Sequence, residues 1–303
     1  MERLQASYPQ VLQSNASLLY GLAQAHRGAG ELDKARDVLL LYVSQFSGTF
    51  EASLAFLERA DLFFQENRVE EGLQAIDLFV ASSAPESLKM QGNLKAVQAC
   101  LTDNRIEEAT KRMINANWSV TTMPELAHLA FLALRCGEHA MTVKDYPAAL
   151  SLFQLVPPKA QLLRMQSEKL ADLSERLARG SGRSLTARNR HQHPYLQTLQ
   201  SQLSQQLNAL ESSEDYTPTF YLHYGQSLLF DTQFYKAWLV FEYIALKDEY
   251  PKKVREEAHY RWIVCAHQLE EWEEALTIAR NFVDRYPESP LAPQASTSLP
   301  RRT

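Results

Sequence analysis

Apolar residues along this chain recur at the spacing of one face of an α-helix, and the whole pattern repeats. An apolar helical stretch, such as residues 18–26 or 221–230, is followed by a short polar turn. After the turn, apolar residues return at positions i, i+3, i+4 and i+7, the spacing of a helix that buries one side. The pattern therefore predicts pairs of amphipathic helices, with a first and a second helix in each repeat.

A small residue marks the same point in every second helix. Its successive positions, which number the repeats from one to six, are Ala35, Gly72, Ala109, Ala149, Ala237 and Ala275. The intervals between them are 37, 37, 40, 88 and 38 residues. A small side chain is expected where two helices cross at close range, because a larger one would overpack the crossing at a cost of about 1–3 kcal/mol. One helix pair cannot bury its apolar face alone, so the pairs are predicted to stack into a solenoid.

The repeats resemble the tetratricopeptide repeat (TPR) family in their pattern of large, small, aromatic and late Pro residues. The matching residues are Leu19, Leu22, Ala23 and Ala35 in repeat one, Tyr221, Tyr224, Gly225, Ala237, Phe241 and Pro251 in repeat five, and Trp262, Trp272, Ala275 and Pro287 in repeat six. Repeats two and three depart from the pattern, because Gly72 replaces Ala and the Pro is displaced to Pro85 and Pro124. The resemblance implies an all-α fold, a right-handed TPR-like superhelix (α-α solenoid) of about six helix pairs with an inserted helical hairpin.

The interval of 88 residues contains the insertion. Residues 159–215 are predicted to form two long helices joined by an Arg-rich linker, 179–193. Along the second of these helices, a stripe over 196–210 has heptad-like spacing; its residues are Leu196, Leu199, Leu203 and Leu210. The stripe is shorter than the three to four heptads or so that a coiled coil needs. A hairpin packed on the solenoid is therefore the first interpretation, and a dimerising arm is the alternative.

The remaining domains follow from this layout. Residues 1–158 hold repeats one to four with a partial repeat at the N-terminus, 216–292 hold repeats five and six, and 293–303 form a disordered tail or a truncated next helix. The Tyr8-Pro9 pair resembles the Tyr-Pro endings of repeats five and six, and neither end has the polar cap that normally closes a solenoid. We therefore expect a segment of a longer repeat protein, or ends that pair with another molecule.

The linker of the insertion carries four arginines and no acidic residue. These arginines, a basic arm, are Arg179, Arg183, Arg188 and Arg190. Such an arm can contact the phosphates of nucleic acid or an anionic membrane surface. However, no aromatic residue lies between the arginines to stack on bases, and the Gly and Ser residues are typical of a solvated linker. With a net charge of −5 for the whole chain, the sequence disfavours nucleic acid as a partner.

Composition and motifs argue against an enzyme. The chain has no Gly-rich phosphate loop, zinc-protease helix or nucleophile elbow. Its tight Cys-His and His-His pairs, such as Cys136 with His139, have no second pair at the spacing of a structural zinc site. The paired glutamates of the second helices, such as Glu70-Glu71, suit the positive end of a helix dipole. We therefore expect no catalytic residues, no metal and no cofactor, and we expect buried cysteines.

The sequence also bears on where the protein acts. No stretch reaches the roughly 18 apolar residues of a membrane span, and the first residues lack the pattern of a signal peptide. As written, the sequence predicts a cytoplasmic protein. A truncated N-terminus would make a periplasmic or envelope location the expectation.

By the TPR resemblance, partners bind in a concave groove lined by the first helices. Carried over by register, the predicted groove residues are Tyr20, Gln24, Arg27, Leu57, Asp61, Phe64, Gln98, Leu101, Glu138, Met141, Gln226, Phe230, Tyr260 and His267. Burial in the core is the alternative for each of them, above all for the Leu residues. The family members that bind an acidic C-terminus carry Lys, Arg and Asn in the lining. Here the lining position fifteen residues before the small residue is mostly Leu or Tyr, so we expect an extended peptide or an amphipathic helix in the groove instead of an acidic C-terminus.

The predicted function is that of a non-catalytic TPR scaffold or adaptor for a protein partner. The ending of repeat six, Tyr286 to Ala292, resembles TPR proteins of the bacterial envelope, namely the lipoprotein of the β-barrel assembly machinery and the Tol–Pal-associated coordinator. That resemblance implies a role in envelope assembly. The alternatives are a self-assembling solenoid, a homo-oligomer built through open ends or the 196–210 stripe, and a regulatory protein whose basic arm touches nucleic acid or lipid.

Overall fold

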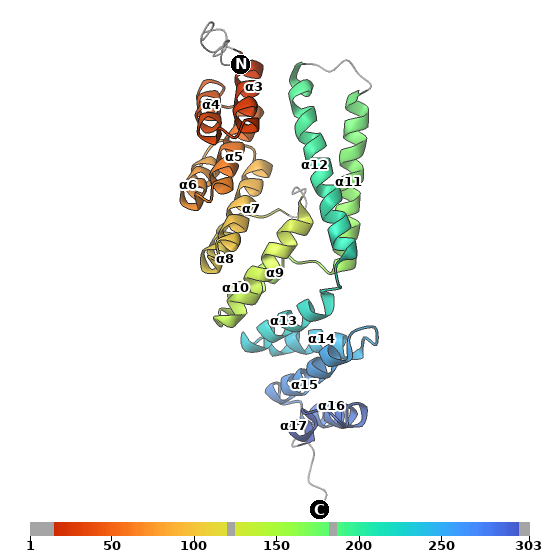
Figure 1. Cartoon of the computed structure of the whole chain (residues 1–303). Helices are drawn as coiled ribbons and strands as arrows, with labels where there is room; N and C mark the ends of the chain where they lie inside the picture. Colours follow the sequence, from red (N-terminus) through yellow and green to blue (C-terminus); the bar gives the residue numbers. More distant parts are fainter. Residues whose placement is uncertain (1–14, 120–124, 182–186, 297–303) are drawn as a thin grey trace, which may run out of the picture. The chain divides into compact units, whose positions relative to one another are not determined.

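The computed structural model describes residues 15–119, 125–181 and 187–296, and within them every regular element is an α-helix (Figure 1). The repeats are helix pairs: α3 (Ala16–Gly28) with α4 (Leu32–Gln45), α5 (Phe50–Gln65) with α6 (Val69–Val80), α7 (Glu86–Thr102) with α8 (Ile106–Asn115), α9 (Leu126–Thr142) with α10 (Tyr146–Phe153), α13 (Thr217–Phe230) with α14 (Phe234–Leu246), and α15 (Lys252–Gln268) with α16 (Trp272–Arg285). A short helix, α17 (Ala292–Ser296), follows repeat six. The prediction of an all-α, TPR-like solenoid is confirmed.

The inserted segment forms two long helices, α11 (Lys159–Ser181) and α12 (Ala187–Ser212). Both extend into the segment 179–193 that the sequence predicted as a linker, because its Ala, Arg and Gln residues sustain a helix on either side of the Gly-Ser stretch. Leu199 and Leu203 of α12 are buried against Leu173 and Leu177 of α11. The 196–210 stripe therefore packs inside the hairpin rather than presenting its central residues to another molecule.

The chain divides into two compact units. Unit 1 contains residues 1–132 and 165–208, and unit 2 contains residues 133–164 and 209–303. Three helices, α9, α11 and α12, contribute residues to both. Compactness is a different criterion from the repeat pattern, so the domain boundaries drawn from the sequence stay a prediction. The predicted partial repeat at the N-terminus lies outside the described residues.

One backbone conformation recurs at every described turn between paired helices. The residue five positions before the small residue has a positive φ, between 59° and 77°; these residues are Gly30, Asn67, Asn104, Lys144, Thr232 and Glu270. The next residue donates its N–H to a carbonyl five residues back in the first helix, as Arg68 does to Phe63 at 2.9 Å. Such a left-handed residue with this bond satisfies the free carbonyls at a helix C-terminus. The turns are therefore structural copies, which fixes the register of the repeats.

The small residues lie where the paired helices cross, as predicted. Ala35, Ala109, Ala149 and Ala237 are fully buried. Gly72 fills the same place in repeat two, where a Cβ atom would lie 2.3 Å from Cε1 of Phe64. The ring of Phe64 thus occupies the space that an alanine methyl group takes in the other repeats.

A second interior position shows how volume is shared between the two helices of a pair. In repeat five, a Cβ atom on Gly225 of the first helix would lie 2.7 Å from the ring of Phe241 in the second helix. In repeat six the sizes are exchanged, since Ile263 and Ala279 hold the equivalent positions and are both buried. Close packing requires such compensation, because neither voids nor overlaps are tolerated in the interior.

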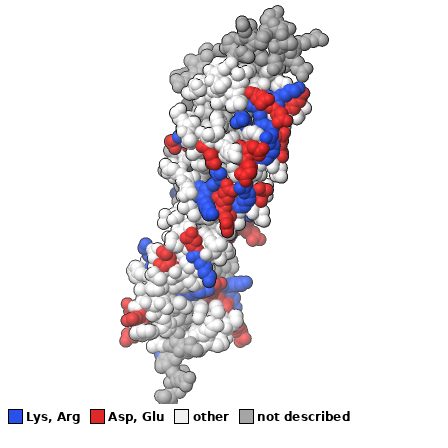
Figure 2. Space-filling model, turned by 90° about the vertical axis from the view of Figure 1, so that its left-hand side faces the viewer, with Lys and Arg blue, Asp and Glu red and all other residues white. Residues whose placement is uncertain are grey.

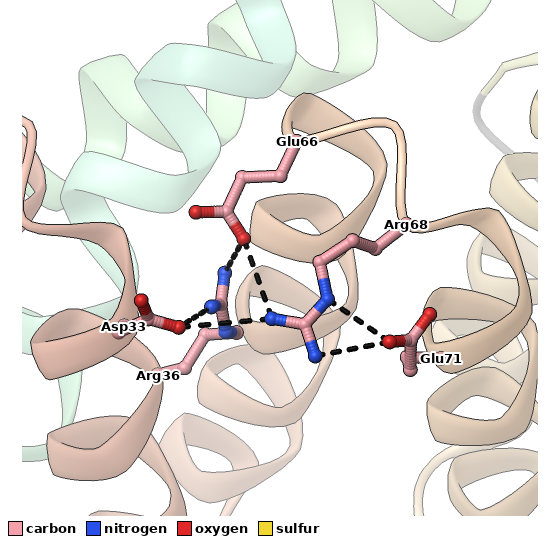
Figure 3. Close-up of polar contacts among 5 residues, drawn as sticks. All are labelled: Asp33, Arg36, Glu66, Arg68 and Glu71. Atoms are coloured by element: carbon pink, nitrogen blue, oxygen red, sulfur yellow. Dashed lines mark hydrogen bonds and ion pairs between the residues drawn. The ribbon is translucent and has the colours of Figure 1, made fainter.

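A network of ion pairs joins the turns and second helices of unit 1. Figure 3 shows Arg36, whose side chain is only 5% exposed, between the carboxylates of Asp33 and Glu66. Arg68 lies 3.0 Å from Glu71 and 3.7 Å from Glu66. Figure 2 shows the band of alternating positive and negative side chains that covers this side of the molecule. A buried guanidinium is stabilised only when it is paired, so these contacts favour one stacking of repeats one and two.

The same kind of contact links repeats two and three. Arg105 lies 2.8 Å from Glu70 and 2.5 Å from Glu108. Arg112 lies 2.7 Å from Asp77 and 3.1 Å from Glu108. The paired glutamates do lie in the first turns of α6 and α8, where the sequence analysis placed them. They also bind arginines, which joins neighbouring repeats.

A buried histidine of unit 2 lies among aromatic rings. His259 is 3% exposed, and its ring lies 5.4 Å from Phe282, 5.6 Å from Trp262 and 5.9 Å from Tyr286, measured between centroids. Burial lowers the pKa of His259 to about 4, because the charged imidazolium loses its hydration there. His259 is therefore neutral in the folded protein at physiological pH.

We predict that Gly72 and Phe64 are energetically coupled. Gly72→Ala in the otherwise unchanged chain should lower the free energy of unfolding by about 1–3 kcal/mol, because the added methyl group displaces the Phe64 ring. In a Phe64→Leu background the same change should raise it by up to about 1 kcal/mol, since Ala favours helix over Gly. Urea unfolding of the four proteins measures the coupling. A stabilising Gly72→Ala in the unchanged chain would contradict the prediction.

Acidification is predicted to destabilise unit 2 through His259. A histidine in an unfolded chain has a pKa of about 6.5, so the unfolded state takes up the proton first as the pH falls. The contribution of neutral His259 is fully present above pH 6.5 or so. It is lost as the pH falls toward about 4, at about 1.4 kcal/mol per pH unit and about 3 kcal/mol in all. His259→Leu should therefore lose less stability than the unchanged chain between pH 7 and 5, and an equal loss in urea unfolding would be evidence against this account.

Candidate protein-interaction surface

All the predicted groove residues but Phe230 fall at three positions of the first helices, fifteen, eleven and eight residues before the small residue; Phe230 lies seven residues before Ala237. At the middle position, unit 1 has Gln24, Asp61 and Gln98, all half-buried. The amide of Gln24 donates to Glu58 of α5 at 2.8 Å, and Lys95 of α7 donates to Asp61 at 2.8 Å. Each side chain thus reaches the next first helix along the stack.

The remaining pairs at this middle position follow the same rule. In unit 1, Gln98 and His128 are joined by a hydrogen bond of 3.1 Å. In unit 2, Glu138 lies 3.4 Å from His223, and Gln226 donates to Glu257 at 2.8 Å. The middle position is therefore a polar seam between successive first helices. Five of the six repeats have a polar residue at this position. That regularity could have indicated the seam, and the sequence analysis did not use it.

Two predicted groove residues are buried instead. Leu57 is 4% exposed and Leu101 is 7% exposed, so both pack in the core and the groove assignment is wrong for them. The reason is that the first helices of neighbouring repeats pack directly on each other, which covers long apolar side chains at these positions. Tyr20 is half-buried and donates its hydroxyl to Glu58 at 2.5 Å. Phe64 is half-buried on Gly72.

Unit 2 keeps an accessible aromatic among the predicted residues. Phe230, at the end of α13, is 47% exposed. Its ring stacks on Tyr146 with centroids 5.1 Å apart, and the guanidinium of Arg261 lies 5.9 Å from its centroid. Arg261 itself lies 3.5 Å from Glu257. An aromatic, a cation and a carboxylate thus share one surface, which can accept both apolar and charged groups of a partner.

The other predicted residues are half-buried. They are Arg27 in unit 1 and Met141, Tyr260 and His267 in unit 2. The His267 ring lies 5.5 Å from the ring of Trp272, which is 58% exposed. These side chains can contribute contact area but are not fully open to a ligand.

An exposed apolar row lies outside the predicted groove. It follows one face of the second helix α14 at i, i+4, i+8 and i+11; its members, between 46% and 66% exposed, are Tyr235, Leu239, Tyr243 and Leu246. The sequence analysis did not single it out, because apolar residues occur on more than one face of this helix. The opposite side of α14, with Ala237 and Phe241, is the buried one.

The four arginines of the basic arm lie at the edges of the described residues or outside them. Arg183 lies outside the described residues. Arg179 belongs to α11, and Arg188 and Arg190 belong to α12, by their backbone alone. The proposed contact of this arm with phosphate or lipid therefore stays a prediction.

The cysteines are buried, which confirms their sequence interpretation. Burial raises the pKa of the Cys100 thiol to about 11 and that of Cys265 to about 12, so neither thiol ionises readily. Over the residues that the structure describes, no three His, Cys, Asp or Glu side chains gather as metal ligands. None of the described helices combines the length and the apolar character that crossing a membrane would take.

Comparisons with known proteins agree with this geometry. Residues 257–289, which cover most of repeat six, match the tetratricopeptide repeat family model. No curated protein matches the chain.

Solved structures show a loose likeness over most of the chain. They include PilF of Pseudomonas aeruginosa, with 14% identity over 93% of this chain and 96% of that one and a TM-score of 0.34. A tetratricopeptide repeat protein from Parabacteroides merdae has 10% identity over 93% and 98%, with a TM-score of 0.34. A putative kinesin light chain with TPR-like repeats from Podospora anserina has 13% identity over 78% and 96%, with a TM-score of 0.31.

The family match, the period, the recurring turn and the small residues at the helix crossings point the same way. Repeat six matches the tetratricopeptide repeat family, and the other described repeats share its small residue and its turn. Tetratricopeptide repeats generally mediate protein–protein interaction and are typically non-catalytic.

Proposed function

We propose that this protein is a non-catalytic scaffold that holds a peptide or an amphipathic helix of a partner protein on the first-helix surface of unit 2. The observation that carries the proposal is the exposed Phe230, an aromatic ring supported from below by Tyr146 at 5.1 Å. A large ring that is already held in place loses little conformational entropy on binding. Such rings are therefore frequent anchors of protein interfaces.

The first-helix surface of unit 1 supports this choice by contrast. There the middle groove position is engaged in the polar seam, as Gln24 is with Glu58. Two of the apolar positions, Leu57 and Leu101, are buried. An external ligand would find few free groups in the groove positions of unit 1, whereas Phe230 offers exposed apolar area in unit 2.

The groups around Phe230 indicate the chemistry of the partner. Arg261 presents a guanidinium beside the ring, and its contact with Glu257 holds it in place. Gln226 also donates to Glu257, so that carboxylate is already shared between two donors. A partner segment that places an apolar side chain on Phe230 and an acidic side chain near Arg261 would satisfy both.

We further propose that the partner belongs to bacterial envelope assembly. The support is the resemblance of the Tyr286 to Ala292 ending to envelope-associated TPR proteins. In the structure this ending is ordered, with Tyr286 buried and Ser289 hydrogen-bonded to Glu256. The segment thus has a structural role in closing repeat six, whichever compartment the protein occupies.

A photo-reactive benzoylphenylalanine at position 230 tests the proposal in cells of the source organism. We expect a cross-linked partner protein, identified by mass spectrometry, whose yield falls several-fold when Arg261→Glu is added. The matched control carries the same amino acid at Leu78, which is 66% exposed in unit 1, and it should give no such product.

Other cross-linking products would point to other functions. Equal products from positions 230 and 78 would overturn the unit 2 site. A product consisting of two copies of this chain would support self-assembly instead. Envelope proteins among the products would support the envelope role, and exclusively cytosolic ones would count against it.

A further inference from the structure

Tyr195 of helix α12, in the hairpin, contacts the first helices of unit 1. The hydroxyl of Tyr195 and the amide of Gln91 in α7 are joined twice, since the amide nitrogen donates to the hydroxyl at 2.9 Å and the hydroxyl donates to the amide oxygen at 3.1 Å. The ring of Tyr195 meets that of Phe50 in α5 edge-on, with centroids 5.7 Å apart. Figure 1 shows α12 running beside the first helices, on the side away from α4, α6 and α8.

The residues that receive Tyr195 share a helix face with the predicted groove residues. Gln91 precedes Lys95 by four positions and Gln98 by seven. Phe50 precedes Leu57 by seven positions and Asp61 by eleven. Positions spaced by four, seven and eleven residues lie on one side of an α-helix. Tyr195 therefore sits at one end of the first-helix surface that the TPR resemblance assigns to ligands.

The pocket for Tyr195 is selective because it is polar and buried. Gln91 is only 6% exposed, so its amide would be left without its partner if a phenylalanine or leucine took the place of the tyrosine. Burial, and after it the half-buried Glu125 just before α9, raises the pKa of Tyr195 to about 12. The site thus favours a neutral hydroxyl over an acidic or phosphorylated group.

The hairpin does not need this contact to keep its own core. Leu173 and Leu177 of α11 pack against Leu199 and Leu203 of α12, and this cluster lies within the hairpin. A second polar contact links the hairpin to the repeats, because the backbone N–H of Ala127 donates to the buried Gln166 of α11 at 3.4 Å. The contact with the first helices is therefore specific and polar, and the apolar cluster would survive its release.

We propose that the surface of α5 and α7 around Phe50 and Gln91 is a binding site for an amphipathic helix that presents a tyrosine. In this structure α12 of the same chain fills it. An external helix of this kind has to displace α12, so the hairpin acts as a competing internal ligand. The proposal concerns unit 1 and is independent of the Phe230 surface in unit 2.

Binding of a labelled peptide of residues 187–212 to the full-length chain tests the proposal by fluorescence anisotropy. Tyr195→Ala in the chain empties the site, so we expect this variant to bind the peptide at least tenfold more tightly than the unchanged chain does. The peptide carrying Tyr195→Ala should not bind either chain. Adding Gln91→Leu to the Tyr195→Ala chain should remove peptide binding.

Controls separate this site from general effects. Gln197 is an exposed residue of α12. Gln197→Ala should leave peptide binding as weak as in the unchanged chain, because α12 still fills the site. Phe230→Glu in unit 2 should not alter peptide binding. Hydrogen exchange checks the state of the variant: Tyr195→Ala should raise amide exchange around Gln91 while the rest of α7 stays protected. Equal affinity of the two chains for the peptide, or no binding to the Tyr195→Ala chain, would overturn the proposal.

Discussion

Where the two helices of a repeat cross, only a small side chain fits, and the rest of the structure is arranged around that close approach. The crossing requires Ala35 or its equivalent to be buried. At a second interior position, a small residue in one helix is matched by a large one in the other, as Gly225 is by Phe241. A left-handed residue recurs at the same place in each described turn between paired helices. Because these local features are repeated, each pair offers the next a matching apolar face, and stacking follows.

The features that recur could be predicted from the sequence, and those that depend on distant neighbours could not. The period and the small residues predicted the helix pairs, because both are local requirements of one crossing. The burial of Leu57 and Leu101 was misjudged, because it depends on how closely the next first helix packs. Gln91 and Tyr195 are 104 residues apart, and no local pattern relates them. Whether a polar side chain of a first helix joins the seam or stays free for a ligand likewise depends on the side chain that the next repeat places opposite it.

The repeats of unit 1 are not interchangeable, because their electrostatic contacts differ from one repeat to the next. The arginines at the turns, Arg68 and Arg105, each contact an acidic residue of the repeat before, Asp33 and Glu70, as well as one of their own repeat. A shuffled order of repeats would bury Arg36 without the carboxylate of Glu66. The ion pairs therefore favour the observed neighbours. The first-helix side carries a parallel set of neighbour contacts, so both sides of the stack specify its sequence.

The contact between Phe64 and Gly72 also constrains how this sequence can change over generations. Alanine is the residue that the other repeats carry at the crossing, yet at position 72 it fits without displacing a side chain only where the ring at position 64 is absent. A change at position 72 is therefore tolerated better after a change at position 64 than before it. The glycine that makes repeat two look irregular is the counterpart of the half-buried aromatic ring packed on it.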